Sequence, residues 1–303
     1  MNTQVLPFNH DSIAKAAASI LAGEPVAIAT ETVYGLAADA TNPKAVARIY
    51  EAKGRPSFNP LIVHVPDIAA AEVLGQFDEQ ANALARAHWP GPLTLVVPLQ
   101  VNAPIASIVT AGLPTIALRV PAHPAMQALL RASGRPLAAP SANRSGSISP
   151  SRAEHVLKSL GGRIPLIIDA GRTERGIEST ILAASGGPVR LLRPGPLVIT
   201  AEAIESEQIE SPGQLPSHYA PSKPLRLNAF EAGPDEFLIG FGPVKGEESL
   251  SETGDPVEAA ARLFDLLHVA DAASSARIAV APIPLEGIGT AINDRLRRAA
   301  HPR

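Results

Sequence analysis

Short apolar runs alternate with amphipathic segments along the N-terminal part of the chain. The amphipathic segments, whose apolar residues recur with helical spacing, lie at 13–21, 43–52, 68–88, 124–132 and 151–160. The apolar runs, which are short enough to be buried strands, lie at 26–29, 61–65, 93–98, 115–120, 137–139, 166–169, 180–184 and 189–192. Because strands and helices alternate only imperfectly, the pattern predicts a twisted α/β sheet of mixed strand direction.

This pattern is interrupted after residue 208. The stretch 211–221 is rich in proline, serine and glycine, which is typical of a linker. Beyond it, two apolar runs and one helical pattern return, at 237–240, 278–281 and 256–268 respectively. The sequence therefore predicts three parts: a large domain over 1–208, a linker over 209–224 and a smaller Rossmann-like α/β domain over 225–303.

Composition narrows the class of protein. The 303 residues are 46% hydrophobic and 18% charged, which suits a globular core, and the net charge of −3 disfavours a protein that mainly grips nucleic-acid backbones. The absence of cysteine excludes disulfides, thiol catalysis and cysteine-bound zinc. The N-terminus lacks the features of a signal peptide, and no apolar stretch approaches the roughly 20 residues of a membrane helix. We therefore expect a soluble cytoplasmic protein.

Two short motifs combine side chains that bind phosphate. Lys53 and Arg55 offer a point charge and a planar guanidinium to one polyanion. Ser141 and Asn143 offer a hydroxyl and an amide, which bind phosphate oxygens or a bound cation. Because the chain contains no G-x-x-x-x-G-K-[ST] sequence, these motifs predict a nucleoside triphosphate site that is not a P-loop.

A set of longer strings follows one order along the chain. These strings are TETVYGL at 30–36, KGRP at 53–56, NPL at 59–61, WPGPLT at 89–94, APSAN at 139–143 and GIEST at 176–180. In this order they resemble the YrdC-like domain of threonylcarbamoyl-AMP synthases. The strings HYAP at 218–221 and GIGTAINDRL at 287–296 resemble the longer, two-domain members of that family. The resemblance implies a twisted α/β sheet around a concave, positively charged face.

The resemblance also implies a reaction. L-Threonine, bicarbonate or CO₂, and ATP are converted to L-threonylcarbamoyl-AMP and pyrophosphate, and a separate tRNA threonylcarbamoyl transferase then modifies an adenosine beside the anticodon. The threonine amine must become a carbamate that attacks the α-phosphorus of ATP, so two anions meet in one site. Fixed cations in a water-poor cleft favour such an encounter, and Mg²⁺ held through the ATP phosphates is expected to help.

The family resemblance assigns most candidate residues to nucleotide binding. We expect a catalytic set of Lys53, Arg55, Ser141 and Asn143, and ATP contacts from Arg55, Asn59, Thr115, Ser141, Ser149, Arg193 and Tyr219. Taken singly, each of these residues also has an ordinary structural explanation. It could lie at a solvated helix end, in a turn or loop, as a threonine in a strand, or as an exposed arginine. Tyr219 is either part of a lid that shields the product from water or an aromatic anchor for the linker.

A second set is matched to threonine, and it comprises Thr32, His64, Arg119 and Ser179, with Ala139 contributing through its backbone. Arg119 either holds the α-carboxylate through two parallel hydrogen bonds or forms an internal salt bridge. His64 is either a ligand, with a further role as base for the ammonium group, or a core histidine. Glu31 and Glu178 are bases or salt-bridge partners, and the sequence does not choose between these roles.

The C-terminal sequence offers two weaker signals. Gly287 and Gly289 resemble the start of a dinucleotide-binding loop, but Ile292 replaces the third glycine, so they are expected to be structural. Arg295 and Arg298 are expected to lie on a solvated helix face.

Two other functions compete with synthesis. A YrdC-like sheet also suits double-stranded RNA, which is recognised by shape and phosphate contacts, so a tRNA-binding module without catalysis is the main alternative. A weak tRNA contact beside catalysis is compatible with the first function. Carbamoyl-transfer enzymes of the hydrogenase-maturation type contain a related domain, but they carry cysteine-rich zinc segments, and this chain has no cysteine.

Overall fold

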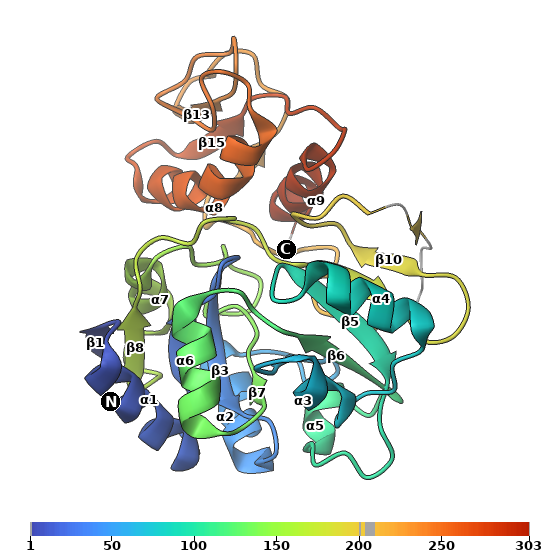
Figure 1. The fold of residues 1–303 in the computed structure, drawn as a ribbon. Helices are drawn as coiled ribbons and strands as arrows, with labels where there is room; N and C mark the ends of the chain where they lie inside the picture. Colours follow the sequence, from blue (N-terminus) through green and yellow to red (C-terminus); the bar gives the residue numbers. More distant parts are fainter. Residues whose placement is uncertain (1, 200, 204–209, 303) are drawn as a thin grey trace.

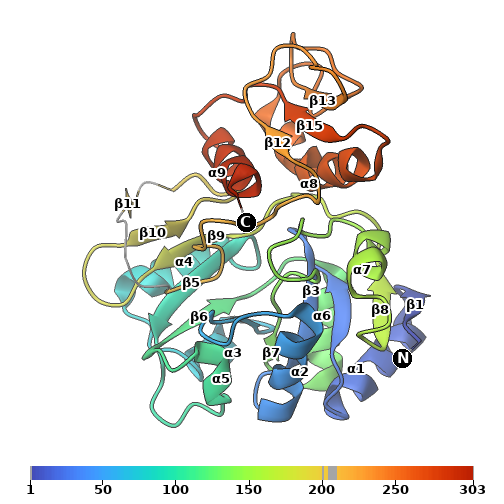
Figure 2. The same ribbon diagram turned by 180° about the vertical axis from the view of Figure 1, so that it is seen from behind.

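The computed structural model describes residues 2–199, 201–203 and 210–302. Within that part of the chain, strands form an 11-stranded sheet and a separate 4-stranded sheet. Figure 1 shows the small domain seated above the large one, with helix α9 (Gly289–Ala300) facing the large domain. From behind, α9 lies over the part of the large sheet that contains β9 and β10 (Figure 2). The predicted α/β class is confirmed, whereas the predicted boundary at residue 208 lies outside the described residues.

The large sheet has mixed strand directions, as predicted. Its order is β1 (Gln4–Pro7), β8 (Leu166–Asp169), β2 (Val26–Ala29), β3 (Tyr34–Asp39), β7 (Leu137–Ala138), β4 (Ile62–His64), β6 (Thr115–Arg119), β5 (Leu93–Pro98), β9 (Thr180–Ala183), β10 (Arg190–Arg193) and β11 (Glu202–Ala203). Strand β2 is parallel to β8 but antiparallel to β3, because the short connection at 30–33 allows only antiparallel pairing. Strands β4 and β6 pair in parallel, as do β5 and β9.

Helices cover both faces of the large sheet. They are α1 (His10–Leu21), α2 (Pro43–Lys53), α3 (Ile68–Glu72), α4 (Glu79–His88), α5 (Ser107–Thr110), α6 (Pro124–Ser133) and α7 (Ala153–Leu160). Strand β2 shows how the two faces divide, because successive side chains point to opposite sides. Val26 and Ile28 pack in the cluster that includes α1 and α6, whereas Ala27 and Ala29 pack in the cluster that includes α2 and α7.

The helix predicted over 68–88 is interrupted. Helices α3 and α4 are separated by a turn that contains Gly75. A Cβ at Gly75 would lie 2.5 Å from a methyl carbon of Val97, and Gly75 forms a β-bridge with Leu99, so the backbone is held against β5 here. Strand β3 was not predicted, because its Gly-Leu-Ala-Ala core has little intrinsic strand preference.

The small domain is a parallel sheet covered by helices. Its strands have the order β12 (Leu225–Arg226), β15 (Arg277–Val280), β13 (Glu236–Gly240) and β14 (Glu248–Ser249). Strands β13 and β15 and helix α8 (Pro256–Ala272) correspond to the predicted elements, whereas α9 was not predicted in full. Among the helices described, none combines the length and the apolar composition that a bilayer span requires.

Candidate functional site

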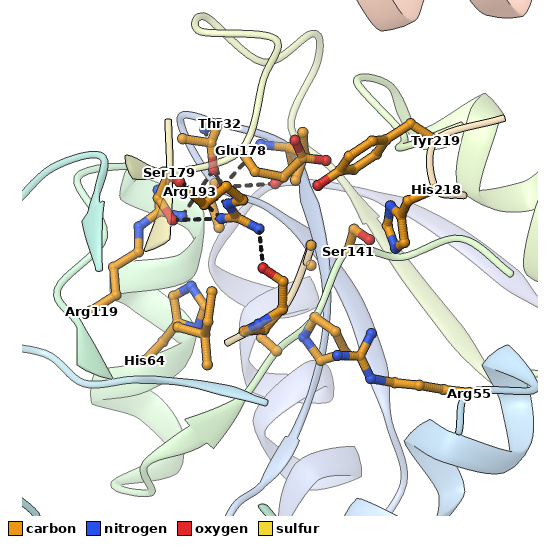
Figure 3. A pocket seen from close by; sticks show the side chains of 18 residues that line it. Thr32, Arg55, His64, Arg119, Ser141, Glu178, Ser179, Arg193, His218 and Tyr219 are labelled. Carbon is orange, nitrogen blue, oxygen red and sulfur yellow. Dashed lines mark hydrogen bonds between the residues drawn. The ribbon is translucent and has the colours of Figure 1, made fainter. Parts of the chain in front are cut away.

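A small pocket lies where the large sheet meets the linker (Figure 3). Its volume is about 50 Å³, which is room for only a few water molecules. The predicted residues that line it are Thr32, Arg55, His64, Arg119, Ala139, Ser141, Ser179, Arg193 and Tyr219. The structure therefore brings members of the predicted nucleotide set and of the predicted threonine set to one place.

The turn between β2 and β3 orients Thr32. The Thr30 hydroxyl donates to the Val33 carbonyl at 2.7 Å and accepts from the Thr32 amide at 3.2 Å, a pattern typical of hydroxyls in turns. The Thr32 hydroxyl in turn accepts from Nη1 of Arg119 at 3.0 Å. The turn and the neighbouring strand thus fix this hydroxyl at the pocket wall.

Arg119, at the end of β6, is buried and already paired. Its Nη2 donates to Oε1 of Glu31 at 2.7 Å, and its Nε donates to the Gly91 carbonyl at 3.3 Å. Burial alone would raise the pKa of Glu31, but the charge and hydrogen bonds of Arg119 outweigh burial and lower that pKa. The internal salt bridge weighed above is therefore present, and Glu31 is the partner. A carboxylate that binds in the pocket would share this guanidinium with Glu31.

His64 is a neutral side chain at the pocket wall. It ends β4 and stands in register with Arg119 on β6. Burial, with the charge of Arg119 as a second cause, lowers the pKa of His64 to about 3. An imidazole with such a pKa is a weak base, so a role in deprotonating the ammonium group is disfavoured. Its Nδ1 has no hydrogen-bond partner among the residues described, which suits a neutral ligand contact.

The side chain of Lys53 does not line the pocket. Its ammonium group is buried and donates to the backbone carbonyls of Ser141 and Asn143, at 2.6 and 2.5 Å. Burial, followed by the charge of Arg55, lowers the pKa of Lys53 well below its ordinary value. Helix α2 ends at Lys53, and Gly54 turns the chain there with a φ of 61°. The two cations of the motif therefore meet different partners. In this structure Lys53 holds the Ser141 loop in place.

Arg55, by contrast, lines the pocket. Its Nη2 donates to the Pro60 carbonyl at 2.9 Å and its Nε to the Asn59 carbonyl at 3.3 Å. Burial lowers the pKa of Arg55 to about 10, so the side chain stays charged at neutral pH. Asn59 is buried beside this guanidinium without lining the pocket, and its Oδ1 has no partner in the described part of the chain.

The loop after β7 contributes both lining and supporting residues. Ala139 and Ser141 line the pocket. Asn143 is buried behind them, and its Nδ2 donates to two carbonyls of its own loop at 2.9 and 2.8 Å. Ser149 is also buried and donates to Oε1 of Glu178 at 2.5 Å. Asn143 and Ser149 therefore support the pocket wall in this structure.

Arg193 and Ser179 meet at the pocket wall. Nη2 of Arg193 donates to the Ser179 carbonyl at 2.9 Å and to the Ser179 hydroxyl at 3.1 Å. The same hydroxyl lies 2.7 Å from the Thr94 hydroxyl, so the three groups form one network. Thr115 lies at the first residue of β6, away from Arg119, and does not line the pocket. Its assignment to the nucleotide stays a prediction.

Tyr219 connects the linker with both domains. The side chain is 1% exposed, and its ring packs against Phe264 of α8 with the ring centroids 5.6 Å apart. The hydroxyl is buried and has no hydrogen-bond partner within the described residues. The ring therefore anchors the linker, while the hydroxyl is placed to meet a ligand. His218 was not among the predicted contacts but also lines the pocket (Figure 3).

The expectation that Arg295 lies on a solvated helix face is wrong. The side chain is 0% exposed, and its Nε donates to Oε2 of Glu178 at 3.0 Å. Glu178 is therefore a salt-bridge partner. Ala291, Ile292 and Leu296 are buried on the same helix, and their spacing around position 295 was the available signal.

Two family models match the chain. One, described as "Telomere recombination", matches residues 18–195, and the other, described as the C-terminal domain of threonylcarbamoyl-AMP synthase, matches residues 175–301. The chain is 43% identical to the threonylcarbamoyl-AMP synthase of Bacillus subtilis, over 98% of this chain and 95% of that protein. It is 39% identical to the threonylcarbamoyl-AMP synthase of Pyrococcus abyssi, over 94% of this chain and 93% of that protein.

The fold is also similar to solved structures. It matches a crystal structure of P. abyssi Sua5 complexed with L-threonine with a TM-score of 0.91. That match covers 98% of each chain at 36% sequence identity. The similarity therefore includes the large domain, the linker and the small domain.

Proposed function

Because the chain belongs to the threonylcarbamoyl-AMP synthase family, we propose that it forms L-threonylcarbamoyl-AMP and pyrophosphate from L-threonine, bicarbonate or CO₂, and ATP. The reaction would make it a nucleotidyltransferase, since the adenylyl group passes to a carbamate. One observation carries the proposal: Arg55, Arg119 and Arg193 are buried and line a single pocket. Three fixed cations favour the approach of two anionic reactants that otherwise repel each other.

We assign the threonine to the end of the pocket formed by Thr32, His64 and Arg119. The guanidinium of Arg119 offers donors to the α-carboxylate, although Glu31 already accepts one of them. The Thr32 hydroxyl and the neutral His64 imidazole flank this group and supply further hydrogen bonds. The L-threonine complex of the P. abyssi relative supports threonine as the substrate.

We assign the ATP phosphates to Arg55, Arg193 and Ser141, which line the pocket together. Mg²⁺ would enter with ATP and be held chiefly by phosphate oxygens, which are ligands that it prefers. The described residues include no group of three or more histidine, cysteine, aspartate and glutamate side chains placed to hold a metal ion. Asn143 Oδ1, which is buried and lacks a partner among them, is one protein oxygen near this loop.

The linker is proposed to act as a lid. A cavity of about 50 Å³ is far smaller than the roughly 300 Å³ or more of ordinary ligand pockets. His218 and Tyr219 lie beside the arginines that we assign to the phosphates, so the linker has to move before ATP enters. Closure behind the substrates would then exclude water from the labile acyl-adenylate.

The product is expected to serve a separate tRNA threonylcarbamoyl transferase, and we therefore place the reaction in the cytoplasm. The alternative of a double-stranded RNA-binding module has less support from the site. Arg55, Arg119 and Arg193 are each 9% exposed or less, so the backbone of an RNA duplex would not reach them. A weak tRNA contact elsewhere on the surface stays a prediction.

One assay tests the proposed function. The protein is incubated with ATP, Mg²⁺, L-threonine and bicarbonate, and pyrophosphate release is followed while each component is omitted in turn. Mass spectrometry checks for threonylcarbamoyl-AMP in the complete mixture. We expect pyrophosphate only when every component is present. Release that does not depend on threonine would contradict the proposal.

A further inference from the structure

Arg295 extends from the small domain to segments that form the pocket in the large domain. Its Nη1 donates to the Pro194 carbonyl at 2.7 Å, and its Nε donates to Oε2 of Glu178 at 3.0 Å. Its guanidinium carbon lies 5.4 Å from the centroid of the Tyr219 ring. The carboxylate of Asp294 accepts a further hydrogen bond at 3.0 Å. One buried side chain thus contacts two segments of the large domain and the linker.

These contacts lie directly beside residues that we assign to substrates. Pro194 follows Arg193, and Glu178 precedes Ser179. Arg193 and Ser179 are themselves joined by the hydrogen bonds from the guanidinium to the serine carbonyl and hydroxyl. A side chain that holds both Pro194 and Glu178 therefore fixes how this wall of the pocket is assembled.

The contact between Glu178 and Arg295 has an electrostatic effect as well as a structural one. Glu178 is a buried carboxylate that lines the pocket, and it acts on the charge of Arg193. Its Oε1 accepts from Ser149, so Arg295 is the cation that pairs with its other oxygen. Without Arg295, this carboxylate would attract the Arg193 guanidinium and repel the phosphates of ATP.

Helix α9 also holds the part of the linker that precedes Tyr219 in the chain. Nη1 of Arg298, which is only partly exposed, donates to the Leu215 carbonyl at 2.7 Å. The Arg298 carbonyl accepts from the His218 amide at 3.2 Å. The helix that carries Arg295 therefore also positions the backbone from which His218 and Tyr219 enter the pocket.

We propose that Arg295 is a positioning residue for the nucleotide end of the pocket, through which the small domain contributes to ATP binding. It neutralises Glu178, which leaves Arg193 for the phosphates, and it supports the ring of Tyr219 when the linker is closed. This inference rests on the proposed function and adds to it a role for the small domain.

The test compares Arg295→Met with Arg297→Met, a change of an exposed arginine on the same helix. For Arg295→Met we expect the KM for ATP to rise about 10- to 100-fold, the scale of losing charged hydrogen bonds. Threonine affinity, measured by calorimetry without ATP, should change much less than the KM for ATP, because Arg119 and Thr32 do not contact Arg295. Ser179 is the one predicted threonine contact in the wall that Arg295 holds. Hydrogen exchange of the linker amides over 211–220 should also become faster. Arg297→Met should behave as wild type in all three measurements.

A second variant separates positioning from simple loss of structure. Glu178→Gln combined with Arg295→Met removes the uncompensated carboxylate, so we expect it to recover part of the ATP affinity that Arg295→Met loses. The inference is overturned if Arg295→Met matches Arg297→Met. It is also overturned if threonine and ATP affinities fall together with no recovery in the double variant.

Failure of the proposed function would look different. In that case the wild-type protein would release no threonine-dependent pyrophosphate. The affinity for α,β-methylene-ATP and the linker exchange would still be compared between Arg295→Met and wild type. A loss of analogue affinity with faster exchange would support the role of Arg295, and no change in either would overturn it.

Discussion

The two ends of the pocket are built in different ways. At the threonine end, His64 and Arg119 stand in register on neighbouring strands, and Thr32 is fixed by a hydrogen bond from Arg119. At the nucleotide end, Glu178 and Tyr219 are held by contacts with Arg295 and other residues of the small domain. The threonine end is therefore built by the large domain, whereas the nucleotide end is completed by the docking of the small domain.

This difference has a consequence for mutagenesis. Side chains on paired strands are fixed by the sheet ladder, so they stay in place while the ladder is intact. Side chains held by a linker and by another domain depend on contacts that open separately from the core. Changes at the threonine end should thus abolish threonine binding, while changes at the nucleotide end should weaken ATP binding and leave threonine binding largely intact.

The largest effect is expected from Arg119→Gln. It removes the guanidinium that we assign to the carboxylate, so threonine affinity should fall about 100-fold or more, and synthesis with it. Calorimetry with threonine measures the first quantity and pyrophosphate release the second. Normal threonine binding by this variant would refute the assignment of the threonine end.

This change also leaves Glu31 buried without its cation, which costs about 3–5 kcal/mol of stability when a pair is broken in this way. The double variant Glu31→Gln with Arg119→Gln is the matched control. Its melting temperature should return close to the wild-type value, while threonine binding stays lost. The two results together separate folding from recognition.

Lys53→Met should act on the nucleotide end. It leaves the carbonyls of Ser141 and Asn143 without their buried donor, which costs about 1–3 kcal/mol of stability. Because the Ser141 loop loses its anchor, we expect the KM for ATP to rise about tenfold with little change in threonine affinity. Lys44→Met, at an exposed position of the same helix, is the control. A variant that is less stable but has the wild-type KM would show that the anchor does not place this loop.

Lys53 and Arg295 also show what the sequence could not predict. Both are charged residues near a helix end or on a helix face, where water or a phosphate is the usual partner. Their actual partners, the Ser141 and Asn143 carbonyls and the Glu178 carboxylate, are distant in the chain and are brought close only by the fold. The pocket itself was predictable, because the family's strings mark the loops that line it, whereas the second layer of contacts was not.

The fold was predictable to a similar extent. Continuous apolar runs mark β2 and β5 well, because these strands are buried on both faces, and helical apolar spacing marks α6 and α8. It failed at the turn around Gly75, where the tight approach to Val97 ends the helix. That contact is a property of the packed structure, but Gly75 itself and Asp78, which caps α4, were local signals of a break.

Acid should weaken the docking of the small domain. His155 of α7 and His268 of α8 stack across the domain boundary with ring centroids 3.9 Å apart. Burial, with the neighbouring His268 as second cause, lowers the pKa of His155 to about 3, and burial lowers that of His268 to about 4. Both groups stay neutral in the folded protein while the unfolded chain protonates below its ordinary pKa of 6.5. Stability that is present above pH 6.5 is therefore lost on acidification.

The expected slope is up to about 1.4 kcal/mol per pH unit for each histidine. Urea denaturation at a series of pH values between 7 and 5, chosen to bracket that ordinary pKa of about 6.5, measures it. Asparagine substitution of both His155 and His268 should reduce the slope, whereas His10→Asn, at an exposed position, should not. An unchanged slope in the double variant would show that the stack does not respond to acid.

The smallest effect is expected from Tyr219→Phe, which tests the lid most sharply. The Tyr219 hydroxyl is buried and has no partner in the described part of the protein, so its removal should not lower the melting temperature. If the hydroxyl meets ATP, the KM for ATP should rise about 3- to 10-fold, the value of one hydrogen bond, while threonine affinity stays constant. Tyr219→Ala also removes the ring that packs on Phe264, and it should lower synthesis further with threonine binding preserved. A turnover equal to wild type in the alanine variant would reduce Tyr219 to a linker anchor, and closure of the nucleotide end would then fall to His218 and the rest of the linker.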